Sequence, residues 1–339
     1  MTIHPAQHDD RDVVITTRAR LARNLADQPF LNRATELQCS HVVRTTQRVL
    51  LDVPIVDKIS WMDLDELTPR DRMLLIERHL ISQHHAESTL HRGVAISENE
   101  QLSIMVNEED HLRIQVLDTG SRLDHAFHEL MRVDAILEQH LDYAFHDRWG
   151  YLAVCPTNVG TGIRFSVMVH LPALRITNEL GKVRRAAKEL HLAVRGYYGE
   201  GSESTGNLYQ VSNQVTLGRT EEELLEEFSQ QVIPGLIDYE RAARDVLMRR
   251  NPVLLEDRIH RAESILRSAR LLKLDEAMKM LSRIRLGAAL GRLDVPLSTI
   301  DDLFVQVQPG HLGQHLNEES TENDVMEMRA SLVRQTLNA

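Results

Sequence analysis

Residues 155–164, Cys-Pro-Thr-Asn-Val-Gly-Thr-Gly-Ile-Arg, combine turn-forming residues with groups that can do chemistry. The proline, the asparagine and the two glycines allow backbone N–H groups to approach a ligand closely. Cys155 adds a thiol and Arg164 a guanidinium. Because these groups pack poorly in a core, the stretch favours an anion-binding site.

Further arginines suit the same chemistry. A guanidinium offers a planar fork of donors and stays charged at physiological pH, which matches the oxygens of a triphosphate. Their convergence in a chain of net charge −11 would be costly without an anion between them. The simplest ligand is a nucleotide with Mg²⁺, although the sequence has neither a P-loop nor a dinucleotide-binding motif. The five arginines are Arg18, Arg20, Arg113, Arg164 and Arg195.

Two stretches carry carboxylates. Residues 107–113, Asn-Glu-Glu-Asp-His-Leu-Arg, separate two apolar runs, and by themselves three consecutive acids are typical of a solvated turn. Residues 196–202, Gly-Tyr-Tyr-Gly-Glu-Gly-Ser, contain too much glycine for regular structure and predict a mobile lid that carries Glu200.

Composition limits the class of protein. A chain of 339 residues with 42% hydrophobic residues predicts two domains, and its negative charge argues against a general nucleic-acid or membrane binder. Two cysteines make no disulfide framework, and we find no signal peptide or membrane-spanning run. We therefore expect a soluble, cytoplasmic protein.

Periodicity predicts the elements that position these groups. Residues 13–20 read as a strand with Arg18 and Arg20 on one side, which alone fits a solvated basic edge equally well. Residues 102–106 and 112–117 predict a hairpin. Residues 163–172 alternate as in a half-buried strand whose polar face lines a site. Further strands are expected at 152–154 and 208–211.

Helices are expected over 32–51, 69–85, 177–191 and, capped by Ser121, over 121–141. From a capping box at Thr220 and Glu223 the chain reads as helical to about residue 290, with breaks at Pro234 and at residues 251–252. The expected organisation is an arm over 1–12, a catalytic domain over 13–218 and a helical domain over 219–339.

His79, His84 and His85 raise the question of a metal site. Their spacing favours no single helix face, and no cysteine or carboxylate completes a ligand set. A surface or nucleotide-contacting role is therefore preferred, and no protein-bound metal is predicted.

The pattern Cys-Pro-Thr-Asn-x-Gly-Thr-Gly-x-Arg at residues 155–164 resembles the signature of the guanidino kinases, which include the phosphagen kinases and bacterial protein-arginine kinases. Residues 16–23, Thr-Thr-Arg-Ala-Arg-Leu-Ala-Arg, are similar to the first phosphate clamp of that family, and residues 107–113 to its second signature. Phe165 departs from the small residue usual after the signature arginine. The resemblance implies an α+β fold, an antiparallel sheet flanked by helices, followed by a helical C-terminal domain.

The resemblance also implies residue roles. Glu109 and Glu200 are expected to hold the substrate guanidinium in line and to accept its proton, with Cys155 nearby as a thiolate. The alternative for Cys155 is a buried, inert thiol. The nucleotide is expected to contact Thr17, Arg18, Ala19, Arg20, Leu21, His79, Arg113, Arg164, Phe165, Ser166, Val167, Met168, Arg195, Gly196, Tyr197, Tyr198, Gly199 and Glu200.

The activity implied is ATP- and Mg²⁺-dependent phosphorylation of arginine side chains in proteins. The bacterial branch is favoured because the first arginine motif begins at once and a helical tail follows. Two alternatives stay open: a kinase for free arginine or another small guanidino compound, and a catalytically silent adaptor that binds phosphoarginine or protease clients. Expected partners are protein substrates, an activator and a protease or chaperone. The sequence leaves monomer and homodimer open.

The tail carries a partial match to a further family motif. Protein-arginine kinases often have Arg-Asp-x-x-Arg-Ala, read as a phosphoarginine pocket that feeds back on activity, whereas residues 325–330 read Val-Met-Glu-Met-Arg-Ala. Loss of the leading charges removes charge-assisted hydrogen bonds. We expect Val325 and Met326 to pack on the helical domain and feedback to be weak, unless Asp324 restores part of the pocket.

Overall fold

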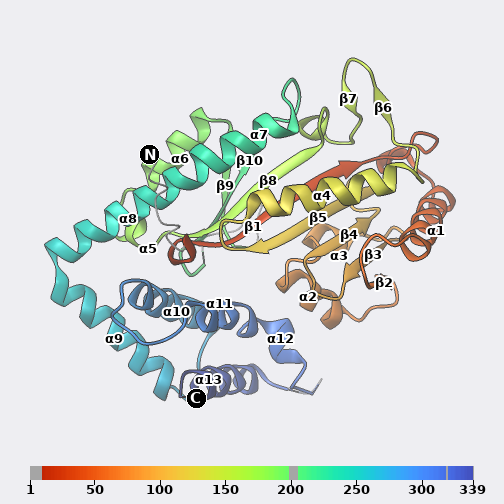
Figure 1. Ribbon diagram of the computed structural model, residues 1–339. Helices are drawn as coiled ribbons and strands as arrows, with labels where there is room; N and C mark the ends of the chain where they lie inside the picture. The colour runs from red at the N-terminus through yellow and green to blue at the C-terminus, as the bar shows by residue number, and fades with distance from the viewer. Residues whose placement is uncertain (1–9, 198–204, 318–319, 339) are drawn as a thin grey trace. The chain divides into compact units, whose positions relative to one another are not determined.

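The computed structural model describes residues 10–197, 205–317 and 320–338 (Figure 1). The chain divides into two compact units. Residues 16–166 and 212–232 form what we call the motif unit, because it contains the motifs at 16–23, 107–113 and 155–164. The described parts of residues 1–15, 167–211 and 233–339 form the tail unit.

An eight-stranded sheet has the order β2-β3-β4-β5-β1-β8-β10-β9. The β2–β3, β3–β4, β4–β5 and β1–β5 pairs are antiparallel, and β6 and β7 form a separate hairpin. The strands are β1 (Val14–Arg23), β2 (Ile59–Asp63), β3 (Gly93–Ser97), β4 (Leu102–Val106), β5 (Leu112–Thr119), β6 (Phe145–His146), β7 (Gly150–Tyr151), β8 (Ile163–His170), β9 (Leu192–Arg195) and β10 (Leu208–Asn213).

Helices of the motif unit cover its strands. α4 packs against β5 and buries its apolar stripe, including Phe127 and Leu130, while α1 packs against β2, β3 and β4. Capping boxes begin α1 and α2, where a threonine side chain accepts the N3 backbone N–H. The helices are α1 (Glu36–Asp52), α2 (Pro69–Glu77), α3 (Gln83–Glu87), α4 (Leu123–Glu138) and α7 (Glu221–Glu227), with short turns at Leu31–Arg33, Pro156–Asn158 and Phe228–Val232.

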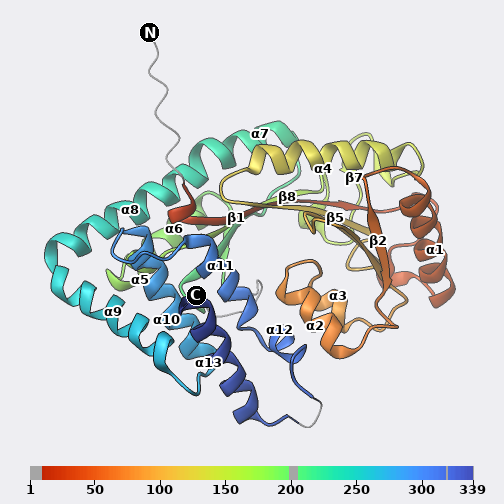
Figure 2. The same cartoon turned by 60° about the horizontal axis from the view of Figure 1, so that its bottom comes forward.

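The tail unit is mainly helical, and its C-terminal helices gather into one cluster (Figure 2). α10 lies against α9 and α11, and its buried face joins α13 in one apolar core. The helices are α5 (Pro172–Ile176), α6 (Leu180–Glu189), α8 (Ile233–Arg250), α9 (Pro252–Ser268), α10 (Leu274–Ala289), α11 (Leu297–Gln306), α12 (Pro309–Gly313) and α13 (Glu322–Asn338), preceded by a turn at Asp10–Asp12.

The α+β prediction with an antiparallel sheet is confirmed, as are the hairpin of β4 and β5 and the capping box at Thr220. The single helix over 69–85 is wrong, because α2 ends at Glu77 and His79 adopts a positive φ of 59° before α3 begins. The helix over 177–191 starts later, at Leu180, since Asn178 also has a positive φ.

Smaller predictions are also corrected. Residues 152–154 form no strand, and α4 has Arg122 rather than Ser121 at its N-cap. The break expected at Pro234 is confirmed, because a π-helix at Phe228–Val232 separates α7 from α8 and Pro234 lies in the first turn of α8, where proline is tolerated. β8 is buried on both faces except at Arg164, so it is not half-buried. In the described part of the chain, no helix is long and apolar enough to cross a membrane.

Candidate active site

Three strands of the motif unit bring arginines together. β1 carries Arg18 and Arg20, β5 carries Arg113 opposite Ala22 of β1, and β8 carries Arg164. A small cavity of about 30 Å³ opens between them. Its lining is Arg20, Leu21, Ala22, Glu108, Glu109, Asp110, Arg113, Asn158, Gly162 and Arg164.

Arg20 lies at the centre of this positive charge. Its side chain is buried, with 8% exposure, and within the described residues its Nε has no hydrogen-bond partner. Burial, followed by the charges of Arg18, Arg113 and Arg164, lowers the pKa of Arg20 well below its ordinary value. A buried guanidinium among like charges is stabilised by an anion, so the cavity is suited to phosphate oxygens.

Glu108 holds Arg113 in place. Its carboxylate accepts from Arg113 Nη1 at 2.6 Å and from Ser82 Oγ at 2.5 Å. Burial alone would raise the pKa of Glu108, but Arg113 and Ser82 hold that pKa at about 2. Glu108 therefore stays ionised and acts as a structural partner of the arginine.

The neighbouring Glu109 has a different environment. Its backbone N–H donates to Glu108 Oε2 at 2.9 Å, and its own carboxylate lines the cavity. Burial, then the charges of Asp110 and Glu108, raises the pKa of Glu109. A carboxylate with a raised pKa beside an anion site is the group expected to accept a proton.

Asp110 joins this turn to the segment before Cys155. Its Oδ1 accepts from Asn24 Nδ2 at 2.6 Å and from the backbone N–H of Val154 at 2.7 Å. Asn24 also accepts from His111 N–H at 2.9 Å. Asn24 was not among the predicted site residues. The sequence marks it only by its position directly after Arg23, the last residue of the motif at 16–23.

The glycines of residues 155–164 are required by the backbone. Gly160 has a φ of 114°, and a Cβ there would lie 2.6 Å from the carbonyl oxygen of Thr216. At Gly162, with a φ of 69°, a Cβ would lie 2.7 Å from the carbonyl of Ala22. The loop therefore packs against β1 backbone to backbone, as the turn chemistry predicts.

Cys155 precedes the turn Pro156–Asn158 and is partly exposed, with its Sγ 3.0 Å from Thr157 Oγ1. The buried thiol of the chain is Cys39, on α1. The inert-core alternative therefore describes Cys39 better than Cys155.

The residues after Arg164 divide between site and core. Ser166 Oγ accepts from Arg18 Nε at 3.3 Å, and Ser212 Oγ accepts from Arg164 at 3.2 Å. The Phe165 ring is fully buried, 5.8 Å from Phe127. The large side chain of Phe165 therefore fills space in the core. Val167 is fully buried, and Met168 lies in the apolar core of the tail unit.

On β1, Thr17, Ala19 and Leu21 are buried, and Leu21 also lines the cavity. His79 lies in the connection between α2 and α3, where its carbonyl accepts from Gln115 Nε2 at 2.7 Å. Burial, then Arg18, lowers the pKa of His79 to about 4, so the imidazole is neutral. The described residues contain no cluster of three metal-binding side chains.

The remaining predicted contacts belong to the tail unit. Arg195 ends β9, and Tyr197 is buried in the apolar core of that unit. Gly196 lies between them. Tyr198, Gly199 and Glu200 lie outside the described residues. The second catalytic carboxylate therefore stays a prediction.

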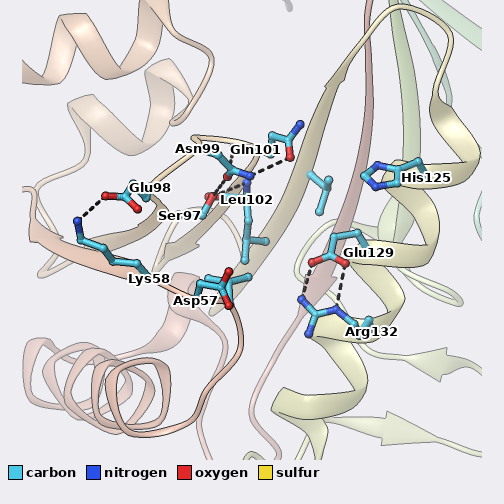
Figure 3. Close-up of a pocket in the computed structure, with 12 residues that line it drawn as sticks. Asp57, Lys58, Ser97, Glu98, Asn99, Gln101, Leu102, His125, Glu129 and Arg132 are labelled. Carbon is cyan, nitrogen blue, oxygen red and sulfur yellow. Dashed lines mark hydrogen bonds and ion pairs between the residues drawn. The ribbon is translucent and has the colours of Figure 1, made fainter.

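A second hollow of the motif unit, of about 510 Å³, shares no lining residue with the arginine cavity (Figure 3). It is lined by Val56, Asp57, Lys58, Ser97, Glu98, Asn99, Gln101, Leu102, Val116, His125, Glu129 and Arg132. Its charges pair with neighbours: Lys58 with Glu98 at 2.5 Å, and Arg132 with Glu129. None of the charged side chains that line it is a buried guanidinium surrounded by other arginines, as Arg20 is.

An antiparallel sheet that gathers arginines around a carboxylate provides the groups that phosphoryl transfer requires. A family model described as "ATP:guanido phosphotransferase, C-terminal catalytic domain" matches residues 41–243, and one described as "Protein-arginine kinase McsB C-terminal domain" matches residues 252–339. The chain belongs to the ATP:guanido phosphotransferase family.

Relatives and solved structures agree with this assignment. The chain is 44% identical to a protein-arginine kinase of Halothermothrix orenii, over 98% of this chain and 95% of the relative. It is 45% identical to one of Brevibacillus brevis, over 97% and 92%. A lombricine kinase structure covers 70% of this chain, and 68% of that chain is matched, at a TM-score of 0.60 and 26% identity. A taurocyamine kinase of Schistosoma mansoni, at a TM-score of 0.64 and 24% identity, covers 71% of this chain and is matched over 34% of its own; it supports the fold alone.

Proposed function

We propose that this protein is a protein-arginine kinase, which transfers the γ-phosphate of ATP to arginine side chains of proteins. The observation that carries the proposal is the buried Arg20, whose Nε has no hydrogen-bond partner among the described residues, beside Glu109, whose pKa is raised. An anion site and a proton acceptor in one cavity fit phosphoryl transfer to a nitrogen nucleophile. Relatives named protein-arginine kinase over nearly the whole chain support the choice of acceptor.

In this proposal Arg18, Arg20, Arg113 and Arg164 bind the triphosphate and stabilise the charge of the transferring phosphoryl group. Arg195 supplies a fifth contact. The reaction is proposed to use Mg²⁺ that enters together with the nucleotide. When bound, Mg²⁺ would neutralise part of the phosphate charge.

Glu109 holds the acceptor guanidinium and removes its proton. The bond between the γ-phosphorus and the bridging oxygen breaks as the nitrogen–phosphorus bond forms, ADP leaves, and the proton passes to the carboxylate. Glu200 is proposed as the second carboxylate and Cys155 as a group near the guanidinium. The partial exposure of Cys155 is compatible with that position.

The test is incubation of the purified protein with ATP and either a casein-like protein or free arginine, followed by measurement of acid-labile phosphate. With the wild-type enzyme we expect acid-labile phosphate on the protein substrate, and with the Glu109→Gln variant we expect none. Label on free arginine at comparable kcat/KM would support a small-molecule kinase instead. No label on either, with nucleotide still bound, would support a silent adaptor.

We also propose a catalytic domain over 13–218 and a helical domain over 219–339. Two separate family matches, at 41–243 and 252–339, support two domains, and the first match extends past residue 218. Protein substrates follow from the proposed reaction. An activator, a protease or chaperone partner and a homodimer stay predictions of the resemblance.

A further inference from the structure

The hairpin of β6 and β7, residues 145–151, lies at the edge of the motif unit (Figure 1). It carries exposed aromatic side chains. The chain has six Phe and two Trp residues, all of them in described positions, and only Phe145 and Trp149 among these are exposed. Their exposed fractions are 57% and 42%. Two exposed aromatic rings in one short hairpin are unusual in a chain whose other Phe and Trp side chains are buried or half-buried.

A hollow of about 430 Å³ lies beside this hairpin, and we call it the hairpin groove. Leu217, 44% exposed, adds an apolar side chain to it. The Arg148 guanidinium lies 4.6 Å from the Trp149 ring centroid and adds a cation. The full lining is Phe145, Arg148, Trp149, Gly150, Tyr151, Gly160, Thr161, Thr216, Leu217, Gly218, Arg219, Thr220, Glu221 and Glu223.

The hairpin groove and the arginine cavity are lined by neighbouring residues of one loop, Gly160 and Thr161 in the groove and Asn158 and Gly162 in the cavity. Tyr151 and Gly160 exchange backbone hydrogen bonds of 2.8 and 3.2 Å, so β7 pairs directly with the loop that carries Cys155 and Arg164. On its other side, Ala144 N–H donates to the carbonyl of Asn24 at 2.7 Å. Asn24 in turn binds Asp110, next to Glu109.

The base of the hairpin is held by several contacts, while the Phe145 and Trp149 side chains stay exposed. The Tyr151 ring lies under the Arg23 guanidinium, at 3.5 Å from ring centroid to carbon, and its hydroxyl donates to Glu138 at 3.0 Å. Phe145 contacts Tyr151 edge to face at 5.3 Å. A rigid support that presents exposed rings is the arrangement of an interface anchor.

We propose that the hairpin groove binds the polypeptide segment that flanks the target arginine of a protein substrate, through apolar or aromatic side chains placed against Phe145 and Trp149. The inference rests on the proposed function. A free guanidino compound occupies only the cavity at Glu109, whereas an arginine within a protein brings neighbouring residues to the surface around that cavity. The groove that shares the Gly160 backbone with the active-site loop is where those residues would lie.

The test compares wild type with the double variant Phe145→Ser/Trp149→Ser. Substrates are a casein-like protein and a short peptide with glycines on both sides of one arginine. We expect KM for the protein to rise about tenfold, as for loss of interface anchors, with kcat for the protein and kcat/KM for the glycine peptide unchanged. The matched control is Leu37→Ser/Leu51→Ser, which removes two exposed apolar side chains from α1 and should change neither substrate.

Unchanged KM for the protein substrate would overturn the proposal. An equal loss with both substrates, together with a changed sedimentation coefficient, would also overturn it and indicate an interface between copies of the chain. If wild type labels no protein at all, the proposed function fails first, which is a separate result.

Fluorescence provides a second measurement that does not depend on the double variant folding. In Trp61→Phe, Trp149 is the remaining tryptophan. A peptide whose arginine is flanked by leucine and phenylalanine should shift the emission of Trp149 to shorter wavelength, and the glycine-flanked peptide should not. Equal spectra with both peptides would contradict the proposal.

Discussion

Asn24 Nδ2 donates to Asp110 Oδ1 at 2.6 Å, and both side chains are buried. The same Asn24 amide donates to the carbonyl of Leu152 at 3.0 Å, and its oxygen accepts from His111 N–H. One side chain thus ties the end of β1 to the turn that carries Glu109 and to the segment that leads to Cys155. Its role is positioning, since it does not line the cavity.

Asn24→Ala should lower both stability and turnover. The substitution leaves buried polar groups unsatisfied, at a cost of about 1–3 kcal/mol for each group that water does not reach. Denaturant unfolding should therefore show a loss of about 2–4 kcal/mol, and kcat should fall more than nucleotide affinity. Asn251→Ala, at an exposed N-cap without a side-chain hydrogen bond, is the control. Equal kcat in both variants would show that Asn24 does not position the site.

Glu109→Gln should nearly abolish phosphoryl transfer and leave nucleotide binding within a few-fold, because the carboxylate contacts the acceptor and no phosphate. In wild type the ionised carboxylate accepts the proton, so kcat should fall as pH is lowered through the raised pKa of Glu109, above its ordinary 4.5. Near-normal turnover of the variant would remove Glu109 from the mechanism.

The same pKa shift makes a stability prediction of known sign. A carboxyl whose folded-state pKa is raised contributes most below its unfolded value of 4.5, and that contribution is lost as pH rises through the folded value. Wild type should therefore be less stable than Glu109→Gln at neutral pH, and the difference should shrink in acid. Urea unfolding at several pH values measures it, and a difference that grows in acid would contradict the shift.

Arg20→Met should raise thermal stability without nucleotide and weaken the response to ATP. The variant replaces a buried, repelled guanidinium by an apolar side chain, which removes an unfavourable charge. Wild type should gain melting temperature on adding ATP with Mg²⁺ because a ligand that binds only the folded state stabilises it. Arg33→Met, at an exposed arginine, should respond as wild type. If ATP with Mg²⁺ raises the melting temperature of Arg20→Met as much as that of wild type, Arg20 does not bind the anion.

The sequence predicted the chemistry better than the contacts that position it. Local periodicity placed Arg18 and Arg20 on one side of a strand, whereas the roles of Arg113 and Glu109 came from the resemblance of residues 107–113 to a guanidino kinase signature. The Asn24–Asp110 bond joins residues 86 positions apart, and no local pattern encodes it. Sheet order and register bring Arg113 opposite Ala22, and these depend on long-range pairing.

Unusual backbone conformations at single residues account for other wrong predictions of secondary structure. His79 and Asn178 adopt left-handed conformations, which interrupt the two segments, 69–85 and 177–191, that were predicted as continuous helices. Such conformations cost little at asparagine and more at histidine, so tertiary packing sets them. Burial of both faces of β8 was missed for a related reason, since alternation at 163–172 reports residue type and not what covers each face.

Cys155→Ser should reduce the rate without changing the unfolding midpoint, because the thiol is partly exposed and packs in no core. The two cysteines should also differ towards an alkylating reagent. Cys39 is fully buried, and burial raises the pKa of its thiol, so only Cys155 should react in the folded protein. Mass spectrometry of the labelled peptides distinguishes them, and a fall in melting temperature of Cys155→Ser would favour a packing role.

Arg329 bears on regulation by phosphoarginine. Its guanidinium is buried and donates to the carbonyl oxygens of Val307, at 2.8 Å, and Leu272, at 2.9 Å. These bonds fasten α13 within the tail unit, and Val325 and Met326 are half-buried on the same helix. A guanidinium engaged with two carbonyls is poorly placed to bind an added phosphate.

We therefore expect excess phosphoarginine to change the initial rate by less than about twofold, below 0.5 kcal/mol of coupling. Arg329→Ala should lower the melting temperature, because it leaves two buried carbonyls without this donor. Glu327→Ala, at an exposed position of the same helix, is the control. A several-fold effect of phosphoarginine that Arg329→Ala abolishes, in protein still folded by circular dichroism, would establish a phosphoarginine pocket at this residue.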